Sequence, residues 1–363
     1  MRVAVRHENQ RVAVETWLPG ETLFSLASRH HIVSCNCFSS DTCRQLFGPR
    51  STGPSHDLPA GIDFFVRATN CRFGEADKVI LERTVLPFYL PFNGKELADK
   101  AVCTMRGDRV SSLKYSLGML LNNFRANHPL RACEVCMKGD NERVGVAYWH
   151  RMHQIPGVWC CPHHHCPLMI SSATGTATGH YNWCLPRREF LECFRTASRS
   201  LEARHAEILE RFAFAALGLT ALAPHMFLDN DLLVQIYSER LVSLGLRETG
   251  GKLRLSDCVA LVLQNSAPLR TRKELSALPD TTDRARAYVS KICWRPVVRM
   301  HPLLHVFAIV WLFDNWKTFW QAAEPVISKQ ATIHPDLTDV PRQNQNSSYR
   351  QHLADVMAEE SWH

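Results

Sequence analysis

The sequence contains no apolar stretch of the about 20 residues that a membrane-spanning helix needs. Its most apolar run, Val306–Phe313, is far shorter and is flanked by His305, Asp314 and Lys317. Residues 1–20 also contain no apolar segment of signal-peptide length. These absences exclude a membrane-spanning chain, predict a buried core helix at Val306–Phe313, and lead us to expect a cytoplasmic protein.

The sequence also lacks the His-Glu-x-x-His pattern of zinc hydrolases, and few carboxylates lie near its histidine-rich stretch. Catalytic zinc needs an open coordination position and usually a neighbouring carboxylate base. A metal-dependent hydrolase or nuclease that uses His150, His153 and the run His163–His165 is therefore the least favoured alternative. We expect no enzymatic activity.

Cysteine, in contrast, is plentiful, with 14 residues in a chain of 363. Disulfides explain them poorly, because the chain is long enough to bury a sizeable core and shows no secretory segment. In a reduced protein we expect most of these cysteines to behave as small buried apolar residues. A Cys-x-x-Cys pair in such a protein favours a metal site instead.

Two closely spaced pairs of metal-binding side chains lie within residues 129–178. Cys133 and Cys136 present two sulfurs from one tight turn, and Cys161 and His164 follow after an intervening loop. Four such ligands in two pairs suit a tetrahedral zinc ion, Zn2+, with no position left for a substrate. The sequence therefore predicts a closed, structural zinc site.

The second pair of ligands has close competitors. Cys166 and His163 lie beside Cys161 and His164 and are the substitutes that we consider first. A further metal site built on Cys184 and Cys193 is an alternative that their spacing disfavours. We therefore predict one zinc site in this chain.

The chain is moderately basic, with a formal net charge of +7, and its arginines outnumber its lysines. Arginine suits bidentate contacts with phosphate and guanine. A charge balance of this size is compatible with nucleic-acid binding but does not establish it.

Two regions have the pattern of a helix-turn-helix with basic side chains. The first joins a helix that opens after Pro19–Thr22 to a short helix that ends at Phe47. Its candidate DNA-contacting side chains are Arg29, His30, Arg44 and Arg50. An ordinary helical hairpin with solvated basic residues is the alternative.

The second candidate lies further along the chain. Ser256 can cap a helix that we expect to end where Ala267–Pro268 turns the chain. The cations Arg270, Arg272 and Lys273 follow at once, where phosphate contacts would be needed. A solvated charged face is again the alternative. In the zinc segment, we expect Arg151 to face outward and to contact DNA.

Several segments resemble the TniQ/TnsD family of transposon target-selection proteins. The most specific is the zinc segment, where Trp-His-Arg-x-His-Gln-Ile-Pro-Gly-Val (149–158) and Cys-Pro-x-His (161–164) follow the first Cys pair. The other similar segments are Leu18–Ser25, Leu46–Gly48, Leu58–Pro59, Arg83–Phe92, parts of 240–254, Trp294 and His301–His305. The resemblance covers roughly residues 15–315.

The resemblance implies an N-terminal helix-turn-helix, zinc-finger elements and helical C-terminal modules. TnsD-type members bind double-stranded DNA at an attachment site and recruit a AAA+ ATPase regulator, which in turn recruits the transposase. TniQ-type members of CRISPR-associated transposons instead dock onto an RNA-guided effector complex. The C-terminal half resembles the TnsD type, but the chain is shorter than longer TnsD-type members, so both modes remain open.

We therefore predict a mainly α-helical protein with an N-terminal helix-turn-helix region (1–128), a zinc-finger segment (129–178) and a C-terminal helical domain (179–320). A mobile polar tail is expected over residues 321–363. The predicted function is non-catalytic selection of the target site in transposition, a form of DNA recombination. A pure adaptor that touches no nucleic acid is the remaining alternative.

Overall fold

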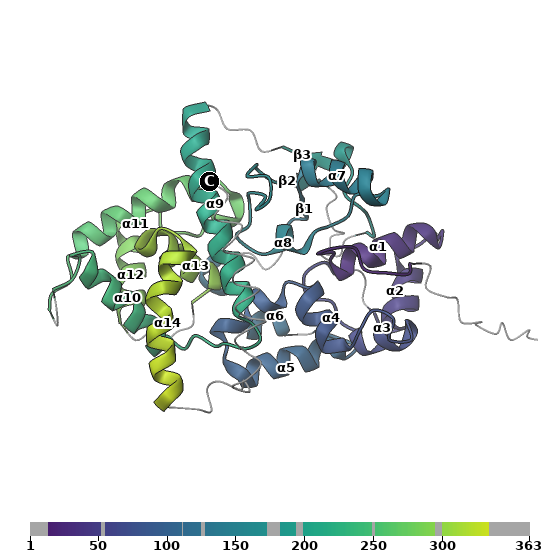
Figure 1. Ribbon diagram of the computed structural model, residues 1–363, viewed down its shortest axis with the longest axis horizontal. Helices are drawn as coiled ribbons and strands as arrows, with labels where there is room; N and C mark the ends of the chain where they lie inside the picture. Colours follow the sequence, from purple (N-terminus) through teal and green to yellow (C-terminus); the bar gives the residue numbers. More distant parts are fainter. Residues whose placement is uncertain are drawn as a thin grey trace, which may run out of the picture.

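The computed structural model describes residues 14–51, 55–110, 112–124, 128–172, 182–193, 199–248, 251–294 and 300–333. These residues form a mainly α-helical fold, as the sequence predicts, with short strands in its central part (Figure 1). Three regions follow one another along the chain: the N-terminal region (14–124), the metal segment (128–193) and the C-terminal bundle (199–333).

The N-terminal region consists of short helices. Its α-helices are α1 (Leu23–Val33), α2 (Ser39–Phe47), α3 (Ile62–Ala68), α4 (Ala76–Arg83), α5 (Gly94–Arg106) and α6 (Leu113–Ser116). Its 3-10 turns are η1 (Leu86–Phe88), η2 (Leu90–Phe92) and η3 (Leu121–Asn123). The backbone N–H of Ser25 donates to the Thr22 hydroxyl at 3.0 Å, so Thr22 caps α1 where the sequence predicts a helix start.

The metal segment combines a small sheet with short helices. Its elements are β1 (Arg131–Ala132), α7 (Glu134–Val144), α8 (Arg151–Gln154), β2 (Met169–Ser171), η4 (Arg188–Phe190) and β3 (Leu191–Glu192). The strands pair antiparallel in the order β1-β2-β3, with Ala132 opposite Met169 and Ile170 opposite Glu192. This sheet holds the start of α7 close to the chain that follows α8.

The C-terminal bundle contains the longest helices. Its α-helices are α9 (Arg199–Leu222), α10 (Asn230–Ser243), α11 (Leu255–Leu269), α12 (Thr282–Cys293), α13 (Pro302–Phe313) and α14 (Trp316–Ile333), and it contains the 3-10 turn η5 (Lys273–Leu275). Helix α9 runs between the other helices of the bundle and the rest of the molecule (Figure 1).

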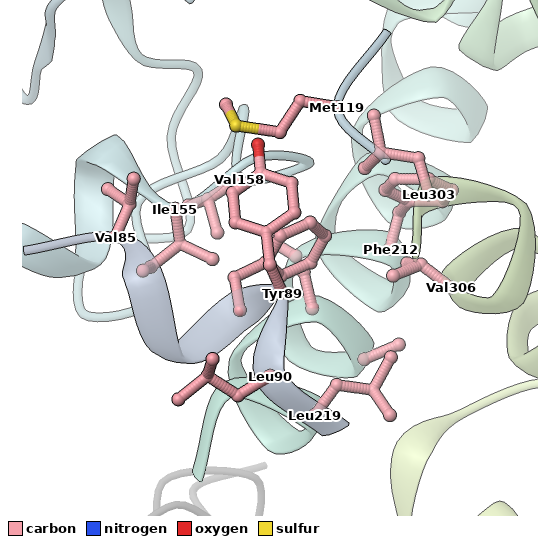
Figure 2. Packing of buried hydrophobic residues seen from close by; sticks show 14 of the residues in the cluster. Val85, Tyr89, Leu90, Met119, Ile155, Val158, Phe212, Leu219, Leu303 and Val306 are labelled. Carbon is pink, nitrogen blue, oxygen red and sulfur yellow. The ribbon is translucent and has the colours of Figure 1, made fainter. Parts of the chain in front are cut away.

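One hydrophobic core joins the three regions. Figure 2 shows Tyr89 of the N-terminal region, Ile155 and Val158 of the metal segment, Phe212 of α9 and Leu303 of α13 in one buried cluster. All five side chains are almost fully buried. The metal segment is therefore packed against both neighbours.

Helix α13 is apolar on all sides and is buried at every residue. This confirms the core helix predicted at Val306–Phe313. Among the residues that the structure describes, no helix has the length and apolar character needed to cross a membrane.

Two expectations about helix ends are wrong. Helix α11 starts at Leu255 with Arg254 in the N-cap position, so Ser256 lies inside the helix, and Pro268 lies in its last turn. Helix α14 continues through residue 320 to Ile333, with Ala323 and Val326 buried against the bundle, so the predicted tail cannot begin at residue 321. The rest of that tail, residues 334–363, lies outside the described residues.

Candidate metal centre

The first Cys pair lies at the start of helix α7. Cys133 follows strand β1 and occupies the N-cap position of α7, and Cys136 lies in the first turn of the helix. The unpaired N–H groups and the dipole at a helix N-terminus favour thiolate over thiol. The local fold therefore presents both sulfurs on one side and favours their metal-binding form.

The second pair lies in a tight turn after α8. The N–H of Cys161 donates to the carbonyl oxygen of Cys166 at 2.8 Å, and the N–H of His165 donates to the carbonyl oxygen of Cys161 at 2.9 Å. A β-bridge between Cys160 and Pro167 closes this turn. The turn thereby brings Cys161 and His164 to the sulfurs of α7.

The four predicted ligands meet in one place. Their ligand atoms all lie within 4.8 Å of one another, and the three cysteines are buried while His164 lies at the surface. His164 Nδ1 is 3.3 Å from the sulfur of Cys136 and 3.5 Å from that of Cys133, and the sulfurs of Cys136 and Cys161 are 3.7 Å apart. Ligands bonded to one tetrahedral zinc at about 2.0 to 2.3 Å are roughly 3.5 to 3.8 Å apart. The donor set therefore fits zinc in type and spacing.

The competing ligands lie at the edge of this cluster. The sulfur of Cys166 is 3.5 Å from that of Cys133, which makes Cys166 the closest substitute. The rings of His163 and His164 are 6.4 Å apart, and His163 is not part of the four-residue group. Within the described ranges of the chain, Cys184 and Cys193 also belong to no such group.

The thiols of the cluster influence one another strongly. Hydrogen bonds from Cys136, Cys161 and Cys166 lower the pKa of the Cys133 thiol. Hydrogen bonding to Cys133 raises the pKa of Cys136, and it raises that of Cys161 to about 11. Sulfurs this close favour one shared negative charge when only protons are available, and a divalent cation would stabilise more than one thiolate.

Two histidines beside the cluster have structural partners. His153 Nε2 lies 3.4 Å from the sulfur of Cys161 and 3.9 Å from that of Cys136, and burial lowers the pKa of His153 well below its usual value. His150 Nε2 lies 2.8 Å from a carboxylate oxygen of Asp140, whose other oxygen accepts from Arg143 at 3.0 Å. The sequence reading missed Asp140, which lies one helical turn after Cys136 on α7.

Arg151 does not face outward as predicted. Its Nε donates to the carbonyl oxygen of Thr84 at 2.7 Å, and burial lowers the pKa of its guanidinium to about 10. Its backbone N–H donates to the carbonyl oxygen of Gly20 at 2.7 Å, and Glu21 forms a β-bridge with His150. Leu18–Ser25 and Trp149–Val158, two segments of the family resemblance that are distant in sequence, therefore contact each other.

The basic residues of the N-terminal helix pair fall into two groups. Arg29 forms a bidentate ion pair with the fully buried Glu21, with atoms 2.6 and 2.8 Å apart, and His30 Nε2 lies 3.1 Å from the side-chain oxygen of Gln45. The side chains of Arg44 and Arg50 are 61% and 75% exposed, with surface ion pairs to Asp41 and Asp108. Of these four predicted side chains, Arg44 and Arg50 are the ones accessible to a phosphate.

The basic cluster after α11 is also divided. Arg272 is 4% exposed, and its guanidinium lies 5.8 Å from the ring centre of the buried Trp159. Arg270 is partly buried, 3.9 Å from Asp280, and Lys273 is exposed at the start of η5. Since α12 starts only at Thr282, the connection is much longer than the 3–4 residues usual for a helix-turn-helix.

Comparisons with known proteins agree with this geometry. The TniQ family model matches residues 16–168, which include the helix pair α1–α2 and all four residues of the cluster. The chain is 24% identical over 181 residues to the transposon Tn7 transposition protein TnsD of Escherichia coli. The aligned region covers 50% of this chain but only 35% of that relative. Residues 16–168 are therefore similar to the TniQ family, and half of the chain is similar to TnsD.

Proposed function

We propose that this protein is a non-catalytic selector of transposon target sites, which binds attachment-site DNA and recruits a AAA+ ATPase regulator and transposase. The observation that carries the proposal is the TniQ match over residues 16–168, together with a Cys/His cluster inside it that has four converging ligands. The similarity to TnsD, a protein named for transposition, supports the same reading.

The metal in this proposal is structural zinc. Cys133, Cys136, Cys161 and His164 would hold it, and the ion would contribute folding free energy rather than chemistry. Four protein ligands leave no position for a hydrolytic water, and the buried pair of His150 and Asp140 holds the chain in place. This arrangement argues against the hydrolase alternative.

The N-terminal DNA contacts in this proposal come from the exposed cations Arg44 and Arg50. Their ion pairs are on the surface, where such pairs contribute little to stability, so they can exchange a carboxylate for a phosphate at small cost. The fold that exposes Arg44 and Arg50 is instead stabilised by Arg29, His30 and Arg151. In the C-terminal bundle, Lys273 is the exposed member of the predicted cluster.

Docking onto an RNA-guided effector is the second candidate, and one observation favours it. Three large apolar side chains, Ile32, Val33 and Phe38, are exposed at the turn between α1 and α2. Exposed apolar groups in a cluster are typical of protein interfaces rather than of contacts with a phosphate backbone. This turn would then face a protein partner.

Duplex binding by the purified full chain tests the proposal. We expect binding that weakens steeply as salt rises, and a target-site duplex that competes better than random-sequence DNA. Arg50→Gln should weaken this binding, whereas Lys138→Gln on α7 serves as the charge-matched control. Absence of duplex binding at any salt, with tight capture by an effector ribonucleoprotein, would contradict direct DNA reading and support the docking candidate.

A further inference from the structure

Helix α12 has two chemically different faces. Ala285, Tyr288, Val289 and Ile292 are buried against the bundle. The opposite face exposes a series at helical spacing, composed of Arg286, Ala287, Ser290, Lys291 and, directly after the helix, Trp294. This face combines two cations with small side chains at its centre, so another molecule can approach the helix closely.

A short hairpin lies beside the end of this face. Arg247 forms a β-bridge with Leu253, and the N–H of Arg254 donates to the carbonyl oxygen of Leu246 at 2.8 Å, between α10 and α11. The hairpin carries the exposed cations Lys252 and Arg254 as well as Arg247. Its cations therefore extend the basic face of α12.

Trp294 joins the two elements. Its side chain is 62% exposed, and the guanidinium of Arg247 lies 5.7 Å from its ring centre. The Nη1 of Arg247 donates to the Ser238 hydroxyl at 3.0 Å, which holds the guanidinium in place. Because exposing a large indole is unfavourable in water, a flat aromatic surface held in this way suggests a binding platform.

The charges of this surface indicate what binds it. Its cations are Arg247, Lys252, Arg254, Arg286 and Lys291. Its acidic neighbours are Glu248, Asp257, which lies 2.6 Å from Arg254, and Asp283 in the first turn of α12. The excess of cations favours a polyanion over an apolar protein surface. An aromatic side chain among cations is typical of nucleic-acid sites, where it packs on sugars or bases.

We propose that the exposed face of α12, the hairpin residues 246–248 and 251–254, and Trp294 form a second contact surface for duplex DNA. This surface rests on the proposed DNA-binding function and assigns part of it to named residues. It takes the place of the basic cluster expected after α11, where Arg272 is buried against Trp159. In Figure 1, α12 lies on the opposite side of the molecule from α1 and α2, so the two surfaces would contact separate stretches of one duplex.

The test measures binding of the full chain to a fluorescent random-sequence DNA duplex over a range of salt concentrations. We expect Trp294→Ala to weaken binding about tenfold, whereas Trp294→Phe, which keeps a ring, retains most of the affinity. Lys291→Gln should lower the slope of the logarithm of affinity against the logarithm of salt by about 0.9. Circular dichroism and thermal unfolding show whether each variant keeps the fold.

The test has two control variants and three results that would contradict the proposal. Tyr115→Ala removes another exposed aromatic ring, on α6, and Lys100→Gln removes an exposed cation from α5, and neither should change duplex binding. Folded Trp294→Ala and Lys291→Gln proteins that bind like wild type would overturn this surface while leaving the proposed function intact. A wild-type protein that binds no duplex would overturn both. A loss confined to a single-stranded DNA probe would also overturn the duplex assignment.

Discussion

The metal segment and the C-terminal bundle reach a fixed structure in different ways. The bundle surrounds α13, whose twelve residues are all buried, and its interior is largely apolar. The metal segment has strands of two or three residues and buries Arg131, Asp140 and His153 among its cysteines. Apolar burial is the main contribution to the stability of the bundle, whereas buried polar groups need specific partners. We therefore expect the metal segment, rather than the bundle, to depend on an ion for folding.

The two regions nevertheless contact each other, in part at a junction around Gly157. Gly157 has φ +94°, and a Cβ there would lie 2.9 Å from Phe212 of α9 and 3.2 Å from Leu303 of α13. His165 of the metal segment also pairs with Glu210 of α9. Damage to the junction should therefore affect both regions, while damage within either region should affect that region first.

Loss of a metal ligand should have the largest effect. Cys133→Ser should release zinc and remove most of the about 10 kcal/mol that a structural zinc site can contribute to folding. We expect the metal segment to become protease-sensitive while the bundle keeps its helices, as measured by metal analysis, limited proteolysis and circular dichroism. Cys103→Ser, at an exposed cysteine of α5, is the matched control. Retention of zinc with an unchanged proteolysis pattern would show that Cys133 is not a ligand.

Two glycine substitutions should distinguish a loss of stability in the bundle from a loss of stability at the junction. In Gly218→Ala, the new Cβ would lie 2.2 Å from the buried Trp316 ring, so we expect about 3 kcal/mol of destabilisation, confined to the bundle. Gly157→Ala adds backbone strain to its clash and should cost about 2 to 3 kcal/mol in both regions. Amide hydrogen exchange resolves the two patterns.

The control for these substitutions is Gly139→Ala in helix α7. A Cβ at Gly139 meets nothing within 4 Å, so better helix propensity should stabilise the protein by about 0.5 to 1 kcal/mol. If Gly157→Ala were equally harmless, the proposed coupling at the junction would be wrong.

Acid should destabilise the bundle through its buried histidines. Burial lowers the pKa of His305 to about 3, and burial with the charge of His305 does the same for His301. The unfolded chain binds these protons first, near pH 6.5, so the free energy of unfolding falls as pH decreases, by about 2 kcal/mol for each group at pH 5.

Comparison of His305→Asn with wild type isolates this effect from acid release of zinc. The pH dependence of denaturant unfolding should differ between the two proteins by the uptake of one proton on unfolding. The zinc content of both proteins is measured at each pH. Identical pH profiles for the two proteins would contradict the assignment.

The smallest effect on stability is expected at the surface. Arg50→Ala removes an exposed ion pair with Asp108, which should change the free energy of unfolding by less than about 0.5 kcal/mol in either region. Thermal unfolding checks this, and the Arg29→Ala variant provides the contrast. Because Arg29 pairs with the fully buried Glu21, its loss should cost about 3 kcal/mol. Equal effects would mean that burial does not distinguish the two arginines.

The metal cluster could be predicted from the sequence because its ligands lie in two short motifs. Cys-x-x-Cys at a helix start and Cys-x-x-His in a turn fix two ligand pairs by spacing, and the structure brings the four side chains together. The Thr22 cap and the core helix α13 were also predictable, since each depends on neighbouring residues. The assignment of these side chains to zinc stays a prediction.

The roles of the cations were not predictable from local patterns. Arg29 and Arg272 look like surface residues in the sequence, but Arg29 is largely buried in its ion pair with Glu21, and Arg272 is buried beside Trp159. The pairing of Asp140 with His150 likewise depends on how α7 packs. Tertiary contacts decide whether a charged side chain is buried. The sequence patterns therefore assigned more arginines to DNA contact than are exposed in the structure.

X-ray absorption at the zinc edge of the purified full chain tests the central claim most directly. A closed structural site predicts three sulfur ligands at about 2.3 Å and one nitrogen at about 2.0 Å, with no oxygen ligand. Protein without zinc, or zinc with a bound oxygen and fewer sulfurs, would contradict the claim that this metal centre is structural.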